Sequence, residues 1–242
     1  MKNKNRTVHR IISSALFLVM FLASYTIYAQ DDIGGGGGAG NIHVGLKAGA
    51  TSNIWGNDYG ACREQKYGAM FGVVAGYDIN SNIEVGLELN YAIIGASGNL
   101  NKYLYLKPVS GNTTDFFYSV QYSKVNLHYI QIPVIATYKV DNLRLFGGLG
   151  YGALLQGVAN NTINLTPSSP VDAFIQGSDN VSNVFQKSDV FGILGAGYTF
   201  DKFFVEARYQ FGLRNINVIN SGYGYYNIYN NTIAISFGYK FM

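Results

Sequence analysis

Hydrophobic and polar or small residues alternate along much of this chain. The clearest stretch is FFVEARYQFGL, residues 203–213. Every second residue in it is hydrophobic, and the residues between them include Glu206 and Arg208. A period of two is typical of a β-strand whose two faces meet different surroundings. The pattern therefore predicts a strand, and it leaves open which face points inward.

The same alternation predicts eight strands in all. One segment, 125–140, is hydrophobic at both parities, so the alternation does not predict its facing. Pro133 within it cannot donate a ladder hydrogen bond, which indicates a bulge or a local break. The eight predicted strands are residues 41–50, 68–79, 83–93, 125–140, 143–156, 189–200, 203–213 and 232–242.

The connections between these strands alternate in length. Those after the second, fourth and sixth strands are short, and the others are the long segments 51–67, 98–122, 157–187 and 214–230. Short turns on one side and long loops on the other are typical of outer-membrane barrels. We therefore predict an all-β fold: an eight-stranded antiparallel up-and-down transmembrane β-barrel with short periplasmic turns and four long extracellular loops.

The N-terminal residues predict export. Residues 1–10 carry four basic residues and no acid, 11–23 are apolar, and Ala29 precedes a plausible cleavage point. This arrangement is typical of a signal peptide. We expect residues 1–29 to be the signal peptide, 30–40 a Gly-rich lead-in, and 41–242 the barrel domain. Removing residues 1–29 changes the formal charge from +3 to −1, which gives no reason to expect nucleic acid.

Composition favours hydrophobic residues that face lipid. Charged residues are 13% of the chain, against about 25% in typical soluble domains. The face opposite the hydrophobic residues is mostly glycine and other small residues, which suit the crowded lumen of an eight-stranded barrel. A soluble ligand-binding barrel, the less favoured alternative, would carry a polar outer face instead. Cys62 is the only cysteine, so the chain forms no internal disulfide.

The second half of the chain resembles a known family. The pattern is similar to PorT-like outer-membrane β-barrel proteins and, more distantly, to OmpX and OmpA barrels. The resemblance implies an integral outer-membrane location, recognition of the C-terminal strand by the insertion machinery, and a link to protein export. Here Met242 follows Phe241, so the terminal aromatic residue is penultimate. The segments that carry the resemblance are YIQIPVIATYKV (129–140), LRLFGGLGYGALL (143–155), FGILGAGYTF (191–200), VEARYQFGLRNI (205–216) and IAISFGYKF (233–241).

Charged residues on the inward face are the first candidate site. An unpaired buried charge is costly, so we expect these residues to pair across the lumen as a plugging network. A gated ion path is the alternative, although eight strands leave no wide channel. The predicted lumen charges are Lys47, Glu84, Glu88, Arg144, Glu206 and Arg208.

An enzyme is the alternative function. Some eight-stranded outer-membrane barrels are lipid A acyltransferases or deacylases with His and Ser near the outer rim. His128 with Ser119 or Ser123, oriented by Asp115 or Asp189, would be the equivalent here. Such a pair needs hydrogen-bond reach and an orienting group, and the sequence shows neither. We therefore expect no catalytic, cofactor or metal site, because HExxH, paired cysteines and a phosphate-binding loop before a helix are missing from the sequence.

Aromatic loop residues are the last candidates. The segment GYGYYNIYNN, 222–231, is dense in tyrosine, which supplies rigid amphipathic contact area in binding loops. We expect contacts with outer-membrane lipid and lipopolysaccharide, and a protein or glycan partner at the loops. The function indicated is a structural or surface-interaction role without enzymatic activity. The tyrosines named for this contact are Tyr223, Tyr225, Tyr226 and Tyr229.

Overall fold

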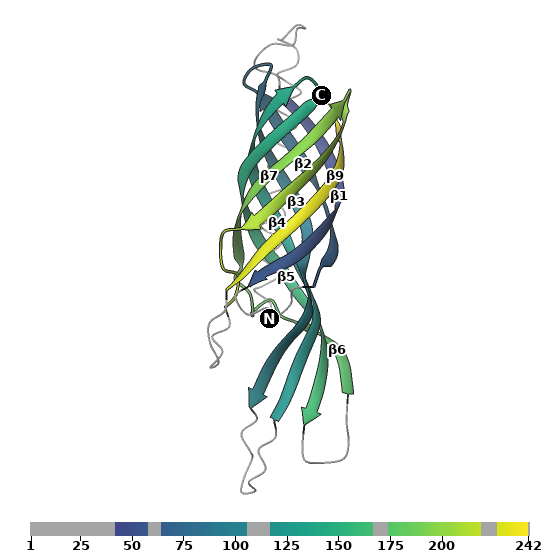
Figure 1. The fold of residues 1–242 in the computed structure, drawn as a ribbon, viewed down its shortest axis with the longest axis vertical. Helices are drawn as coiled ribbons and strands as arrows, with labels where there is room; N and C mark the ends of the chain where they lie inside the picture. Colours follow the sequence, from purple (N-terminus) through teal and green to yellow (C-terminus); the bar gives the residue numbers. More distant parts are fainter. Residues whose placement is uncertain (1–41, 58–63, 106–116, 167–173, 219–226, 242) are drawn as a thin grey trace, which may run out of the picture.

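The chain forms a tall sheet of antiparallel strands. The computed structural model describes residues 42–57, 64–105, 117–166, 174–218 and 227–241 (Figure 1). No helix among these residues is long and apolar enough to cross a membrane. Residues 1–41, which include the predicted signal peptide and lead-in, lie outside them, as does Cys62. The strands are β1 (Ile42–Asn57), β2 (Lys66–Asp78), β3 (Ile83–Tyr105), β4 (Phe117–Val140), β5 (Leu143–Thr166), β6 (Phe174–Asn180), β7 (Ser188–Phe200), β8 (Phe203–Gly212) and β9 (Ile228–Lys240).

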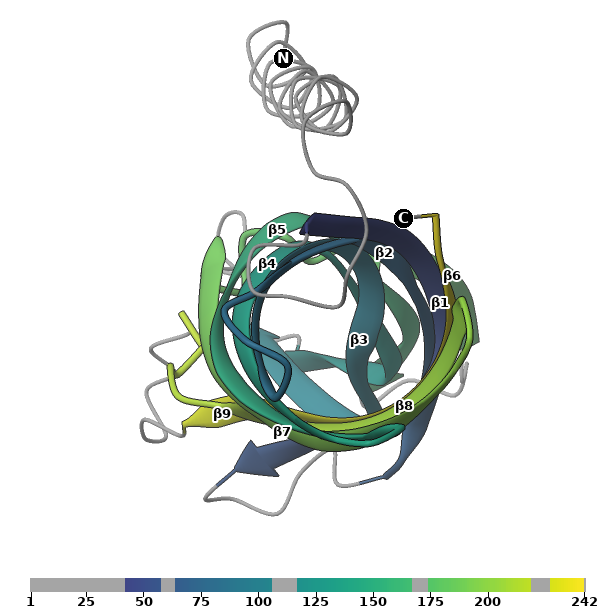
Figure 2. The ribbon, with the colours of Figure 1, turned by 90° about the horizontal axis from the view of Figure 1, so that it is seen from above.

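Eight of the strands close into a ring. Each pairs with its neighbours in the order β4-β3-β2-β1-β9-β8-β7-β5, and a further pairing of β4 with β5 completes the barrel. Figure 2 shows this closure along the barrel axis. The predicted closed eight-stranded antiparallel barrel is confirmed. The ninth strand, β6, pairs only with β5 among the described residues and stands outside the ring.

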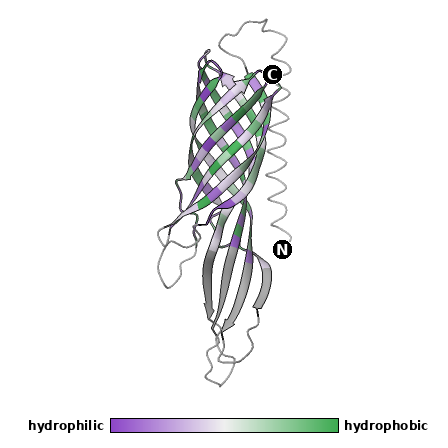
Figure 3. Ribbon diagram, turned by 45° about the vertical axis from the view of Figure 1, so that its right-hand side comes forward, coloured by the Kyte–Doolittle hydropathy of each residue, from purple (hydrophilic) through white to green (hydrophobic). Residues whose placement is uncertain are grey.

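The outer wall of the barrel is hydrophobic. Alternate residues of each strand are exposed, among them Leu149 at 64%, Leu194 at 61% and Ile235 at 60%. The residues between them face the lumen, and Figure 3 shows the two kinds alternating along the strands. The outward residues of β5 from Leu143 to Ala153 rise roughly 25 Å at ordinary strand rise and tilt, the height of an apolar membrane band.

The facing of β4 is now defined. Gln131, Pro133 and Ile135 are buried, whereas Ile132 and Val134 are exposed, so the odd-numbered residues face the lumen. No register shift occurs at Pro133, and its pairing with β5 is continuous. Pairing with β3 is interrupted there and resumes in the same register. The proline therefore causes a local break and not a bulge.

Two predicted loops are largely strand. Within 98–122 and 157–187, β3, β4 and β5 continue past the barrel, and β6 adds to β5. The result is a four-stranded extension, formed by β3, β4, β5 and β6 beyond Ser97, Lys124 and Val158 (Figure 1). The loop prediction was wrong here because these segments are rich in Asn and Ser, a composition that favours loops over strands.

Candidate functional site

Four charged side chains meet in the middle of the lumen. Lys47 of β1 lies 2.7 Å from Glu88 of β3 and 2.9 Å from Glu206 of β8. Arg208 donates two 2.9 Å hydrogen bonds to the two oxygens of Glu88 and another to Glu206. These four residues, the central quartet, are all nearly inaccessible to solvent. Two positive charges balance two negative charges, which is the condition for burying ions at tolerable cost.

A second group of charges lies nearer the short turns. Arg144 donates a 2.7 Å hydrogen bond to Glu84, and Lys139 lies 2.6 Å from Asp78. His43 is 3.3 Å from Glu84. The ligand atoms of His43, Asp78 and Glu84 lie within 4.8 Å of one another, close enough to hold a metal ion. Because each carboxylate already has a cationic partner, the site disfavours a divalent cation.

A small cavity of about 30 Å³ separates the two charge clusters. Glu84, Arg144 and Lys240 line it toward the short turns, and Glu88 and Glu206 line it toward the quartet. Its volume suits a water molecule and no organic ligand. All six charges that the sequence assigned to the lumen therefore face inward, and the structure sorts them into two clusters.

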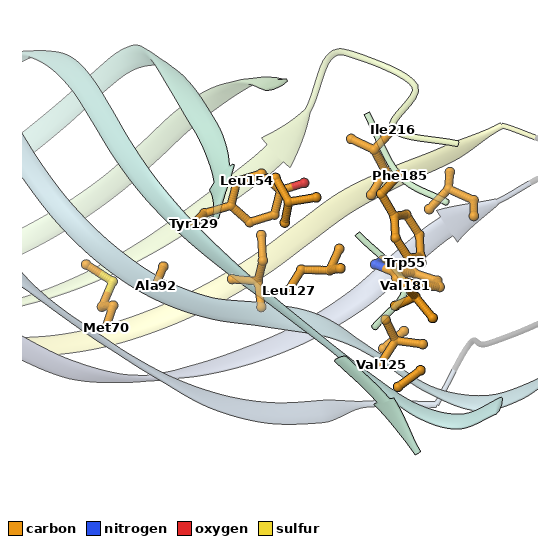
Figure 4. Close-up of a cluster of buried hydrophobic side chains, with 14 of the residues drawn as sticks. Trp55, Met70, Ala92, Val125, Leu127, Tyr129, Leu154, Val181, Phe185 and Ile216 are labelled. Atoms are coloured by element: carbon orange, nitrogen blue, oxygen red, sulfur yellow. The ribbon is translucent and has the colours of Figure 1, made fainter. Parts of the chain in front are cut away.

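The other half of the lumen is filled by hydrophobic side chains. Trp55, Leu127 and Tyr129 are almost fully buried there, and Phe185 lies 5.4 Å from Trp55, centre to centre (Figure 4). Phe185 comes from the segment between β6 and β7, which closes the barrel from the long-loop end. The sequence did not indicate this plug, because several of its residues, among them Trp55 and Phe185, come from segments predicted to be loops. Its buried members are Trp55, Met70, Ala92, Ile94, Ala96, Val125, Leu127, Tyr129, Leu154, Ala159, Val181, Phe185, Ile216, Ile228 and Ala234.

Polar side chains fasten this plug to the wall. Trp55 Nε1 donates a 2.9 Å hydrogen bond to Asn230, whose amide nitrogen donates a 2.7 Å bond to Asp189. Backbone bonds also hold the segment, including one of 2.8 Å from Gln186 N to the carbonyl of Ile216. The lumen is thus blocked by ion pairs in its middle and by packed hydrophobic side chains between these ion pairs and the long-loop end.

The residues of the enzyme alternative do not come together. His128 faces outward from β4, and its Nδ1 lies 2.6 Å from the hydroxyl of Tyr91. Asp189 faces the lumen and is 1% exposed, so the barrel wall separates it from His128. Ser119 belongs to the extension, well beyond His128 along β4. Asp115 lies outside the described residues.

Of the loop tyrosines, Tyr223, Tyr225 and Tyr226 lie outside the described residues. Tyr229 lies within β9, where it pairs with Gly56 of β1, so it belongs to the wall of the barrel. On the long-loop side of the barrel, the feature that the structure does describe is the extension. β-branched and aromatic residues in 117–122 were the sequence signal that could have found it.

Comparison with known proteins identifies one family and several solved structures with a similar fold. The model described as outer membrane protein beta-barrel domain matches residues 28–218. No curated protein matches the chain. Ail of Yersinia pestis is 12% identical with a TM-score of 0.43, covering 82% of this chain and 98% of Ail. Neisserial surface protein A is 13% identical with a TM-score of 0.42 over 83% of this chain and 99% of its own. The Escherichia coli outer membrane protease OmpT is 10% identical with a TM-score of 0.41, over 83% and 97%.

Proposed function

Because this chain belongs to the outer membrane protein beta-barrel domain family, we propose that it is a non-enzymatic interaction protein that presents the four-stranded extension to a protein partner. Membership of the family makes it an integral protein of the bacterial outer membrane. Short turns of such barrels face the periplasm. That rule puts the extension on the cell surface and Lys202, in the turn between β7 and β8, in the periplasm.

The observation that carries the proposal is the free edge of the extension. β6 is the last strand of the sheet, and among the described residues only β5 pairs with it. β3 beyond Ser97 likewise pairs only with β4 in the described part of the chain. A sheet edge presents a row of unpaired backbone N–H and C=O groups. An extended segment of a partner adds to such an edge through main-chain hydrogen bonds.

The lumen and the outer rim support a role outside catalysis and transport. The plug and the central quartet fill the barrel, and the cavity between the charge clusters is water-sized. His128 is held by Tyr91 on the outer face of the barrel wall, whereas Asp189 faces the lumen, which disfavours a Ser–His hydrolase at the rim. The resemblance to PorT-like proteins adds a finer proposal, a link to protein export. Comparing the proteins secreted by cells with and without this chain tests it.

Photo-crosslinking tests whether a partner docks at the edge. A photoreactive residue replaces Ser178, on β6, or Asn160, its paired neighbour on β5. Lys202, exposed at the opposite end of the barrel, is the control position. On irradiation of whole cells we expect a protein adduct at position 178, a weaker one at 160, and none at 202, each identified by mass spectrometry.

The adduct pattern separates the alternatives. Equal yields at 178 and 160 would indicate docking on the face of the sheet and would contradict strand addition. Protein adducts that form equally at 178 and 202, or form at neither, would contradict a surface-interaction role for the extension.

A further inference from the structure

The outer wall of β4 changes character at one height. Its outward residues are hydrophobic from Tyr138 to Ile130. Beyond Ile130 the outward residues are His128, Asn126 and Lys124. The change comes at the upper limit of the apolar band, just before the extension leaves the barrel. In the outer membrane this is the level of the outer-leaflet headgroups.

Neighbouring β5 carries two polar side chains at this level, one on each side of Val158, which pairs with Asn126. Gln156 pairs with His128 and Asn160 with Lys124 in the β4–β5 ladder, and both are exposed. We call these five outward side chains the rim patch: Lys124, Asn126, His128, Gln156 and Asn160. It offers amide and imidazole groups that can donate and accept hydrogen bonds, next to one ammonium group.

No acidic side chain among the described residues pairs with the positive charge of the rim patch. Lys124 is exposed and makes no ion pair with a described residue. Glu64 is exposed two strands away, bridging to Ser97, which pairs with Lys124. Behind the wall, the buried ammonium of Lys66 has one described hydrogen bond, of 3.5 Å, to the carbonyl of Ile94.

His128 is held in place at the lower side of the patch. Its Nδ1 is engaged by Tyr91, which leaves Nε2 for a ligand. Tyr91 in turn packs against Phe71, with ring centroids 5.1 Å apart. The patch is therefore bounded below by an aromatic wall that faces the acyl chains of the bilayer.

We propose that the rim patch binds the phosphate-bearing headgroup of an outer-leaflet glycolipid. A phosphate complements the charge of Lys124 and accepts hydrogen bonds from it. Sugar hydroxyls match the amides of Gln156 and Asn160, and acyl chains lie against Tyr91 and Phe71. The patch spans the barrel wall and the base of the extension, and none of its residues lies on the free edge of β6, so the inference stands whether or not a partner adds to β6.

Lipid binding by the complete mature barrel tests the proposal. The barrel is placed in phosphatidylcholine nanodiscs that contain diphosphorylated lipid A, its dephosphorylated form, or phosphatidylglycerol. Native mass spectrometry then counts the lipids retained. We expect preferential retention of phosphorylated lipid A, weakened about tenfold by Lys124→Ala through loss of a charge-assisted hydrogen bond. Lys124→Arg should retain most of the binding.

Matched variants distinguish lipid binding at the rim patch from nonspecific electrostatic attraction between the barrel and anionic lipid. Lys202→Ala removes an exposed lysine at the periplasmic end and should leave retention unchanged. Heat-modifiable gel mobility confirms that each variant is folded. Equal retention of the phosphorylated and dephosphorylated lipids, equal retention of phosphatidylglycerol, or an unchanged Lys124→Ala variant would each overturn the proposal.

Discussion

Glycine residues in the lumen lie directly against the rings of phenylalanine residues. A Cβ on Gly195 would overlap the ring of Phe146, and one on Gly238 would overlap the ring of Phe204. These rings in turn lie near cations, with Arg208 5.5 Å above Phe146 and Arg144 5.6 Å above Phe204. The glycines thus make room for the rings that surround the buried charges. This explains why the inward face is rich in glycine although the lumen is full.

Gly195→Ala tests this packing. We expect a loss of about 1–3 kcal/mol in the free energy of unfolding, because the ring of Phe146 must move. The measurement is urea unfolding of the refolded barrel in lipid vesicles. Gly86→Ala is the matched control, since its Cβ would come no closer than 3.4 Å to any atom and should cost less. A similar loss in both variants would contradict the role of Phe146.

Arg208→Gln tests the central quartet. Removing the guanidinium leaves Glu88 and Glu206 with one cation between them, so we expect a loss of about 3–5 kcal/mol in unfolding free energy. Adding Glu88→Gln should restore part of that loss, because a neutral pair replaces an unbalanced charge. Additive losses in the double variant would show that the pairing of Arg208 with Glu88 contributes little.

At the scale of elements, the extension is separate from the closed ring. β3, β4 and β5 belong to both parts, whereas β6 belongs to the extension alone. The central quartet and the plug both lie within the barrel. The barrel should therefore not depend on the far part of the extension for its stability.

Excising the far part of the extension tests this independence. Residues 100–121 and 161–177 are each replaced by a short Gly-Ser turn. We expect a barrel that still inserts and still shows heat-modifiable gel mobility, because the ring pairings are untouched. Deleting β8 is the control that should abolish insertion. If the excised variant also failed to insert, the extension would be part of the folding unit.

At the scale of the whole molecule, the two ends of the barrel differ in accessibility. Trypsin added to intact cells should cleave after Arg214, which is exposed just beyond the end of β8 on the surface side, and spare Lys139 and Lys202. Lys47 and Arg208 are buried and should be protected in membrane fragments as well. Mass spectrometry of the released peptides gives the sites. Cleavage after Lys202 in intact cells would reverse the assigned orientation.

The ring, and the facing of every strand but β4, could be predicted from the sequence, because lipid outside and small or charged residues inside impose a period of two. In β4 the inward face also carries hydrophobic residues such as Ile135, so its facing could not be predicted. Glu206 and Arg208 were assigned inward on that basis alone. Their partners could not be predicted, because the contact with Glu88 depends on the curvature that brings β8 toward β3. The plug and the extension were missed, since Phe185 follows no period and the segments of the extension have the polar composition of loops.

The three shared strands give the molecule a mechanical property. β3, β4 and β5 each run from the barrel into the extension as one continuous strand, with shifts of register where the extension begins. A force that pulls the extension along the barrel axis therefore acts along the length of these strands. Many inter-strand hydrogen bonds must then break together, and they cannot break one at a time. A cell attached to a surface through the extension would be held along the direction in which a β-sheet is stiffest.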